Sequence, residues 1–163
     1  MRQKIFAILL VSILLSGCLG QDDNDIEFNG IEYRYPPDAP DFTLIDQNGQ
    51  DFTLSDLEGK VVVVAFVYTS CPDICLAISA NMAYAQDSLG EESDDVVFVS
   101  VTIDPARDTV EHLSDWTESR GYNWTHLTAE RPSTLMEVYS SWNVIVDDEH
   151  IAASTPPEGA MNR

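Results

Sequence analysis

Two cysteines separated by three residues are the side chains of this sequence best suited to chemistry. They enclose the segment Cys71-Pro72-Asp73-Ile74-Cys75. In the first turn of a helix, residues four apart are separated by about 6 Å along the axis, which is within the Cα range from which a disulfide forms. The same geometry lets both sulfurs approach one ion. The pair therefore predicts either a redox dithiol or a soft-metal site.

The expected position of the two cysteines favours reactive thiolates. Pro72 is typical of the first helical position, so Cys71 is expected near the amino-terminal cap. Unpaired backbone N–H groups and the positive end of the helix dipole lower a thiol pKa there. Thiolates select soft ions such as Cu(I), whereas a structural zinc site needs four ligands that the sequence does not supply. An inert structural disulfide is the alternative, but a bridge closing so short a loop adds little stability.

A strand–helix–strand unit is expected to position the cysteines. Residues 61–68 and 96–103 are continuous apolar runs rich in β-branched side chains, which predicts two central strands buried on both faces. Between them, apolar side chains recur every three or four residues from 73 to 88, and Gly90 follows, which predicts a helix that ends there. A right-handed crossover makes the two strands parallel. The cysteines fall where the first strand runs into the helix.

A β-hairpin is expected before this unit. The sequence Asp-Phe-Thr-Leu occurs at residues 41–44 and again at 51–54, on either side of an Asn-Gly turn that tolerates positive φ. Ser55 is then expected to cap a short helical turn that ends at Gly59.

Two more helices and a weak strand are expected after the unit. Asp108 or Thr109 can cap one helix, and Pro132 opens another. Residues 124–128 form the weak strand between them. The whole pattern indicates an α/β fold in one globular domain, covering residues 39–163.

The amino terminus indicates export and anchoring. Arg2 and Lys4 precede an apolar run over residues 5–15, and Ser16, Gly17 and Cys18 follow. The run is shorter than the roughly 20 residues of a spanning helix, so residues 1–20 are interpreted as a signal peptide with a lipobox, in which Cys18 is lipidated after cleavage. An uncleaved anchor is the alternative. Either interpretation predicts an extracytoplasmic, membrane-anchored protein.

The chain is strongly acidic, and its first segment after the signal is irregular. Residues 21–38 are polar and then proline-rich, which is typical of a flexible tether. The net charge is −20. Without Arg2 and Lys4, 6 basic residues remain against 28 acidic ones, so the net charge becomes −22. A surface of this sign excludes nucleic acid as a partner, and most of the charge is interpreted as a solvated surface.

Two motifs together resemble one known family. Residues 63–75, which end in the cysteine pair, and residues 99–109, which contain Asp104-Pro105-Ala106-Arg107-Asp108, are similar to the Sco/SenC family of copper-delivery proteins. The segment Ala39-Pro40-Asp41-Phe42 fits as well, and the resemblance covers residues 28–145. It implies a thioredoxin-like α/β fold, with a mostly parallel central sheet flanked by helices and preceded by the hairpin.

The resemblance also implies a function. Members of this family bind copper through both cysteines and a distant histidine, help assemble the copper centre of cytochrome c oxidase and act as thiol reductants. Carried over, Cys71 and Cys75 are copper ligands and redox partners, and the copper-receiving oxidase subunit is the protein partner. Asp104 and Arg107 match a family segment near the cysteine turn, where capping and pairing within the loop is an equally good interpretation.

The chain departs from the family pattern towards its carboxyl end. The family histidine lies on a strand after the third long helix, and no such motif is present. His112, in an expected helix, and His126, in the weak strand, are interpreted as structural. His150, in a polar loop, is the one late candidate and is not assigned to the site. Only 17 residues follow Val146, so the chain looks truncated, without the carboxyl-terminal hairpin and helix of the domain.

Two other functions remain open on the residues alone. An extracytoplasmic thiol–disulfide oxidoreductase would use the same cysteine pair, although the thioredoxin motif has two residues between its cysteines and this sequence has three. A lipid-anchored binding module would use the acidic surface, and the cysteines would then only staple the turn.

Overall fold

The computed structural model describes residues 30–146, except the side chain of Glu92. The chain divides into two units, Met1–Pro37 and Asp38–Arg163, and every helix and strand of the described residues lies in the second. The signal peptide, the lipobox with Cys18 and the candidate His150 lie outside the described residues. Between residues 30 and 146, no helix combines the length and apolar character needed to cross a membrane.

Five strands form one mixed sheet in the order β2-β1-β5-β4-β3. Strand β3 (Val61–Val67) pairs in parallel with β4 (Val96–Thr102), and β4 pairs in parallel with β5 (Thr125–Thr128). The predicted hairpin, β1 (Thr43–Asp46) and β2 (Asp51–Thr53), joins the same sheet because β1 lies antiparallel to β5.

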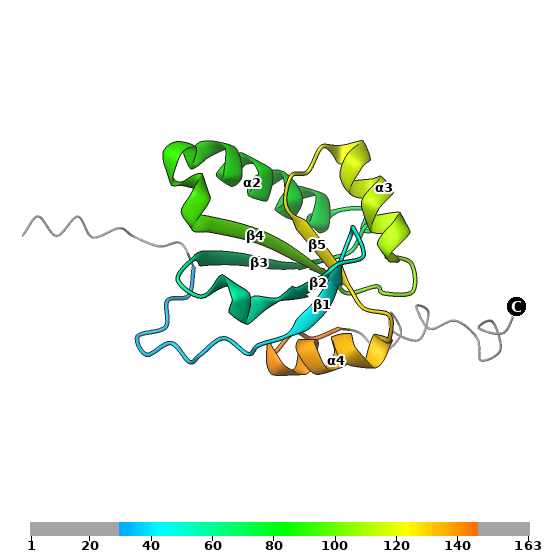
Figure 1. The fold of residues 1–163 in the computed structure, drawn as a ribbon, viewed down its shortest axis with the longest axis horizontal. Coiled ribbons are helices and arrows are strands. Elements are labelled where there is room, and N and C mark those ends of the chain that lie inside the picture. Colours follow the sequence, from blue (N-terminus) through cyan, green and yellow to red (C-terminus); the bar gives the residue numbers. More distant parts are fainter. Residues whose placement is uncertain (1–29, 147–163) are drawn as a thin grey trace, which may run out of the picture. The chain divides into compact units, whose positions relative to one another are not determined.

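Helices cover both faces of this sheet (Figure 1). Helix α2 (Ile74–Ser88) connects β3 to β4, and α3 (Val110–Arg120) connects β4 to β5. Both lie on one face, and α4 (Pro132–Ser141) lies on the other. Two 3₁₀ helices, η1 (Leu54–Leu57) and η2 (Gly90–Asp95), precede β3 and β4. The α/β prediction is therefore confirmed.

Strand β4 divides the core into two layers because its side chains alternate between the two faces. Val99 and Val101 are fully buried against Leu135 of α4. On the opposite face, Phe98 packs with Met82 of α2 and with Trp124. A continuous apolar strand between two helical layers accounts for the buried run that the sequence contains.

The expectation that β3 is a central strand is wrong for the described residues. It lies at the outer edge of the sheet, and the central strand is β5, which the sequence indicated only weakly. Val61 of β3 is 62% exposed. An apolar run indicates that the side chains of a strand are buried, but it does not indicate how many strands pair with its backbone. The sequence therefore could not distinguish an edge strand from a central strand.

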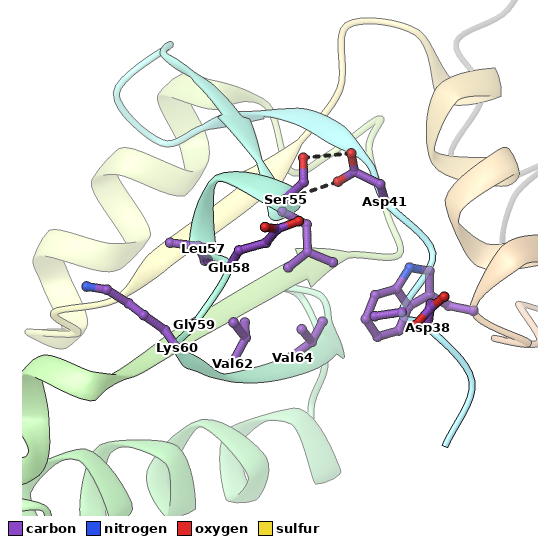
Figure 2. Close-up of a pocket in the computed structure, with 12 residues that line it drawn as sticks. Asp38, Asp41, Ser55, Leu57, Glu58, Gly59, Lys60, Val62 and Val64 are labelled. Carbon is purple, nitrogen blue, oxygen red and sulfur yellow. Dashed lines mark hydrogen bonds between the residues drawn. The ribbon is translucent and has the colours of Figure 1, made fainter. Parts of the chain in front are cut away.

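A groove lies on each face of β3. On the α4 face, Val62 and Val64 form the floor of a groove of about 750 Å³ (Figure 2). Trp142 lines the same groove, and Asp38, Asp41 and Glu58 contribute acidic groups to it. On the α2 face, a second groove of about 580 Å³ is lined almost entirely by apolar side chains, among them Val61 and Val63.

The predicted cap at Ser55 is also wrong. The 3₁₀ helix η1 starts at Leu54 with Thr53 as its cap residue, so Ser55 lies inside it. The Ser55 hydroxyl instead donates to Asp41 Oδ2 at 2.8 Å, and the Ser55 N–H donates to Asp41 Oδ1 at 3.0 Å, as Figure 2 shows. The hydroxyl therefore ties η1 to the segment that leads into the hairpin.

Candidate dithiol site

The carboxyl ends of β3 and β4 lie at the same edge of the sheet, and the cysteine turn begins there. Cys71 follows β3 after a short turn, and Cys75 lies in the first turn of α2. Each cysteine is 7% exposed, and both are free thiols. They pack with Val67 in one small apolar cluster. The structure thus brings the two predicted site residues together, with both side chains almost fully buried.

Backbone hydrogen bonds fix the turn around the Cys71 sulfur. The Cys71 N–H donates to the Tyr68 carbonyl oxygen at 3.3 Å, which closes the turn after β3. The Cys75 N–H donates to Cys71 Sγ, also at 3.3 Å. Asp73 is the cap residue of α2, but its side chain makes no capping hydrogen bond. The Cys71 sulfur therefore accepts a helix N–H that a capping side chain would otherwise satisfy.

The prediction that Pro72 occupies the first helical position is wrong. Helix α2 begins at Ile74, so Pro72 lies two residues before it, ahead of the cap residue Asp73. The fixed φ of a proline suits a tight turn as well as a first helical residue, and the sequence does not distinguish the two. The displacement leaves Cys71 outside the helix with its sulfur facing the helix start.

The two thiols have opposite pKa shifts. Burial raises the pKa of Cys71, but hydrogen bonds from the Cys75 thiol, the N–H groups of Asp73 and Cys75, and the Tyr68 hydroxyl together hold it below the ordinary value. Burial, followed by the hydrogen bond to Cys71, raises the pKa of Cys75 to about 11. Cys71 is thus the group that ionises first, and Cys75 keeps its proton and donates a hydrogen bond to the Cys71 thiolate.

The loop after β4 packs behind the cysteine turn. Asp108 accepts hydrogen bonds from the Thr69 N–H at 3.1 Å and from the Thr102 hydroxyl at 2.5 Å. Its other oxygen accepts from the Thr69 hydroxyl. Sequence reasoning assigned Asp108 only a possible cap and did not select Thr69. Both residues follow neighbouring parallel strands at the same sheet edge, and that position is the signal that could have identified them.

Asp104 and Arg107 form an ion pair within the loop after β4. The Asp104 side chain is fully buried, whereas that of Arg107 is half exposed. The Asp104 N–H donates to the Thr102 hydroxyl at 2.9 Å, and the Asp104 carbonyl accepts from the Asp108 N–H at 2.9 Å. The interpretation that these two residues pair within the loop is therefore confirmed, whereas the cap of the following helix is Thr109.

Both described histidines have structural contacts. His126 is 2% exposed among the rings of Trp116, Tyr122 and Trp124, and burial lowers its pKa to about 4. His112 lies in α3, with its Nε2 3.0 Å from the Thr69 hydroxyl oxygen. Over residues 30–146, no three side chains of His, Cys, Asp or Glu are grouped so that they could hold a metal together. The described donor set at the turn is the two sulfurs.

The sequence profile of the SCO1/SenC family matches residues 35–159.

The chain belongs to the SCO1/SenC family. Among curated relatives, the SCO1 protein homolog of Bacillus subtilis is 30% identical over 131 residues, which are 78% of this chain and 64% of the relative. SenC of Rhodobacter capsulatus is 34% identical over 106 residues, or 64% and 48% of the two chains. The SCO2-like protein RT0576 of Rickettsia typhi is 40% identical over 75 residues, or 46% and 37%. The chain thus covers less than two thirds of each of these relatives.

Solved structures of the SCO1/SenC family confirm the thioredoxin-like fold. Copper-bound ScoI of Bradyrhizobium japonicum superposes with a TM-score of 0.60 at 28% identity, covering 64% of this chain and 66% of that one. A SCO1/SenC family lipoprotein of Bacillus anthracis has a TM-score of 0.57 at 34% identity and covers 64% of both chains.

The opposite pKa shifts predict an order of reaction. When the fully reduced protein is treated with limiting iodoacetamide, Cys71 should be alkylated at a lower pH than an ordinary thiol requires, whereas Cys75 should stay protected until the pH approaches 11, because alkylation needs the thiolate. Peptide mapping by mass spectrometry across a pH series measures both midpoints. Alkylation of Cys75 before Cys71, or of both with one midpoint, would contradict the assignment.

Proposed function

We propose that this SCO1/SenC protein is an extracytoplasmic metallochaperone whose cargo is copper. Cys71 and Cys75 hold the ion, and the copper-receiving subunit of a cytochrome c oxidase accepts it. The observation that carries this proposal is a buried pair of free thiols in one turn, with the anion of one of them stabilised. ScoI of Bradyrhizobium japonicum and ScoI of Arabidopsis thaliana, both crystallised with copper bound, support it.

The chemistry of the two sulfurs suits a soft cation. Cys71 presents a thiolate or an easily formed one, and Cys75 must release its proton when an ion is bound by both. Thiolate pairs favour Cu(I) over harder ions. The nearby apolar contacts of Val67 keep water from competing strongly for the sulfurs.

The unequal thiols also provide a route for release. A group with a pKa near 11 regains its proton readily once its metal bond breaks at neutral pH. Protonation of Cys75 therefore favours the step in which a ligand of the partner replaces it on copper, and Cys71 remains the last protein ligand. Cargo transfer then proceeds by exchange of one sulfur at a time, with no free ion.

Thiol–disulfide exchange is the second candidate function, and the same pKa difference favours it. The Cys71 thiolate attacks one sulfur of a target disulfide, and the other target sulfur leaves as a thiolate. Cys75, after losing its proton, attacks the mixed disulfide, so that the target is reduced and Cys71 and Cys75 become oxidised to a disulfide. An external thiol reductant then resets the pair. BsSco, a Sco-family protein 30% identical to this chain, is described as having a disulfide switch.

Copper binding should require both thiols. The reduced protein is expected to bind one Cu(I), and Cys71→Ser and Cys75→Ser should each weaken binding by about 100-fold or more, because a hydroxyl is a poor ligand for a soft ion. Competition with a chromogenic Cu(I) chelator measures the affinity, and Ser70→Ala is the matched control within the same turn.

A disulfide-reductase assay on the same samples separates the two candidates. Tight copper binding without turnover supports the chaperone, and turnover without tight copper binding supports the oxidoreductase. Unchanged copper affinity in both cysteine variants would contradict the copper site at Cys71 and Cys75.

We also propose that lipidated Cys18 anchors the protein to the membrane surface. The SCO1/SenC family lipoprotein of Bacillus anthracis supports this placement. In a bacterial host that lipidates lipobox proteins, the full chain should enter the detergent phase on Triton X-114 partition. Cys18→Ser should move it to the aqueous phase, and Cys71→Ser should leave it in the detergent phase. A Cys18→Ser protein that remains in the detergent phase would contradict lipidation and indicate an uncleaved anchor.

A further inference from the structure

Asp108 is a fully buried carboxylate that lies between three elements of the fold. It accepts hydrogen bonds from Thr102 at the end of β4 and from Thr69 in the turn after β3. Its own residue lies two positions before the start of α3. Three donors on two oxygens satisfy most of the acceptor capacity of a carboxylate, which is what burial of such a group requires. Asp108 therefore joins the β4–α3 loop to the turn before the dithiol.

The Thr69 end of this connection is close to the reactive sulfur along the chain. Thr69 directly follows Tyr68, whose carbonyl oxygen accepts the Cys71 N–H and whose hydroxyl hydrogen-bonds to the Cys71 sulfur. Asp108 holds both the backbone N–H and the hydroxyl of Thr69, so it restrains rotation as well as position of that residue. Displacement of Thr69 would move the Tyr68 groups that set the environment of Cys71.

The direction of the hydrogen bonds extends the restraint to α3. The Thr69 hydroxyl has one proton, and it goes to Asp108, which is an acceptor when ionised. The 3.0 Å contact between His112 Nε2 and the Thr69 oxygen therefore has the histidine as donor. These hydrogen bonds run from His112 through Thr69 to Asp108. They link α3 to the turn that precedes the dithiol.

We propose that Asp108 is a positioning residue for the dithiol, which acts through Thr69 to hold the turn in the geometry that keeps Cys71 ready to bind Cu(I). The inference rests on the proposed copper function and deepens it, because it assigns the residue behind the sulfur ligands. Outer-shell partners that orient metal ligands typically change affinity by about 10- to 100-fold when they are replaced.

Two variants test the proposal. Asp108→Asn keeps the shape of the side chain but replaces one acceptor oxygen with an NH₂ group, which cannot accept from Thr69. Thr69→Val removes the hydroxyl while keeping the branched shape, and Thr69→Ser restores the hydroxyl and serves as the rescue. Asp115→Asn, at an exposed acid on α3, is the control for the change of charge. Circular dichroism at 25 °C establishes that each variant is folded before it is measured.

The readouts are Cu(I) affinity and the pH midpoint of Cys71 alkylation. Asp108→Asn and Thr69→Val should each lower the affinity by about tenfold or more and move the alkylation midpoint of Cys71 to higher pH. Thr69→Ser and Asp115→Asn should match the wild type. Folded Asp108→Asn and Thr69→Val proteins with wild-type affinity and midpoint would overturn the proposal. If Asp108→Asn does not fold, Thr69→Val decides alone.

The alkylation midpoint also separates this proposal from the copper function. A wild-type protein that binds no Cu(I) overturns the copper function, whatever the variants do. In that case a raised Cys71 midpoint in the two variants still supports Asp108 as a positioning residue for the thiol, and an unchanged midpoint overturns that as well.

Discussion

The contact between the Cys75 N–H and the Cys71 sulfur is the interaction on which the site depends. A helix start leaves its first N–H groups without partners inside the helix, and here one of them is satisfied by a thiol rather than by a capping side chain. A sulfur that accepts this N–H is more stable as an anion, and the Cys75 thiol and the Tyr68 hydroxyl add to the effect. The same hydrogen bond thus stabilises both the start of α2 and the reactive Cys71 thiolate.

The rest of the domain supplies the conditions for this contact. Strand β3 must end a short turn before α2 begins, and its parallel pairing with β4 brings the loop after β4 to the same edge of the sheet. Buried Asp104 and Asp108 give that loop a fixed shape, the first through its ion pair with Arg107 and the second through hydroxyl groups. Tyr139 of α4 also reaches the end of β4, where its hydroxyl donates to the Thr102 carbonyl at 2.6 Å. Both helical layers therefore support the edge that carries the thiols.

Sequence reasoning reached the features that depend on local pattern. The hairpin and the strand–helix–strand unit follow from periodicity. Capping chemistry predicted Asp108 or Thr109 at the start of α3, and the structure has Thr109, whose hydroxyl accepts the His112 N–H at 3.2 Å. The edge position of β3 did not follow, because apolar runs carry no information about strand order. The contact between Thr69 and Asp108 joins residues 39 positions apart, so no local pattern contains it. The unequal thiols also needed the turn itself, since the start of α2 decides which sulfur accepts the N–H.

The central claim, that both sulfurs of this turn hold one copper ion, is tested most directly by X-ray absorption spectroscopy at the copper edge. The reduced full chain, loaded with one equivalent of Cu(I), should show two sulfur neighbours on the metal. The Cys75→Ser protein prepared in the same way should show one. A first coordination shell of nitrogen and oxygen alone in the unsubstituted protein, or a shell that the substitution leaves unchanged, would contradict the account.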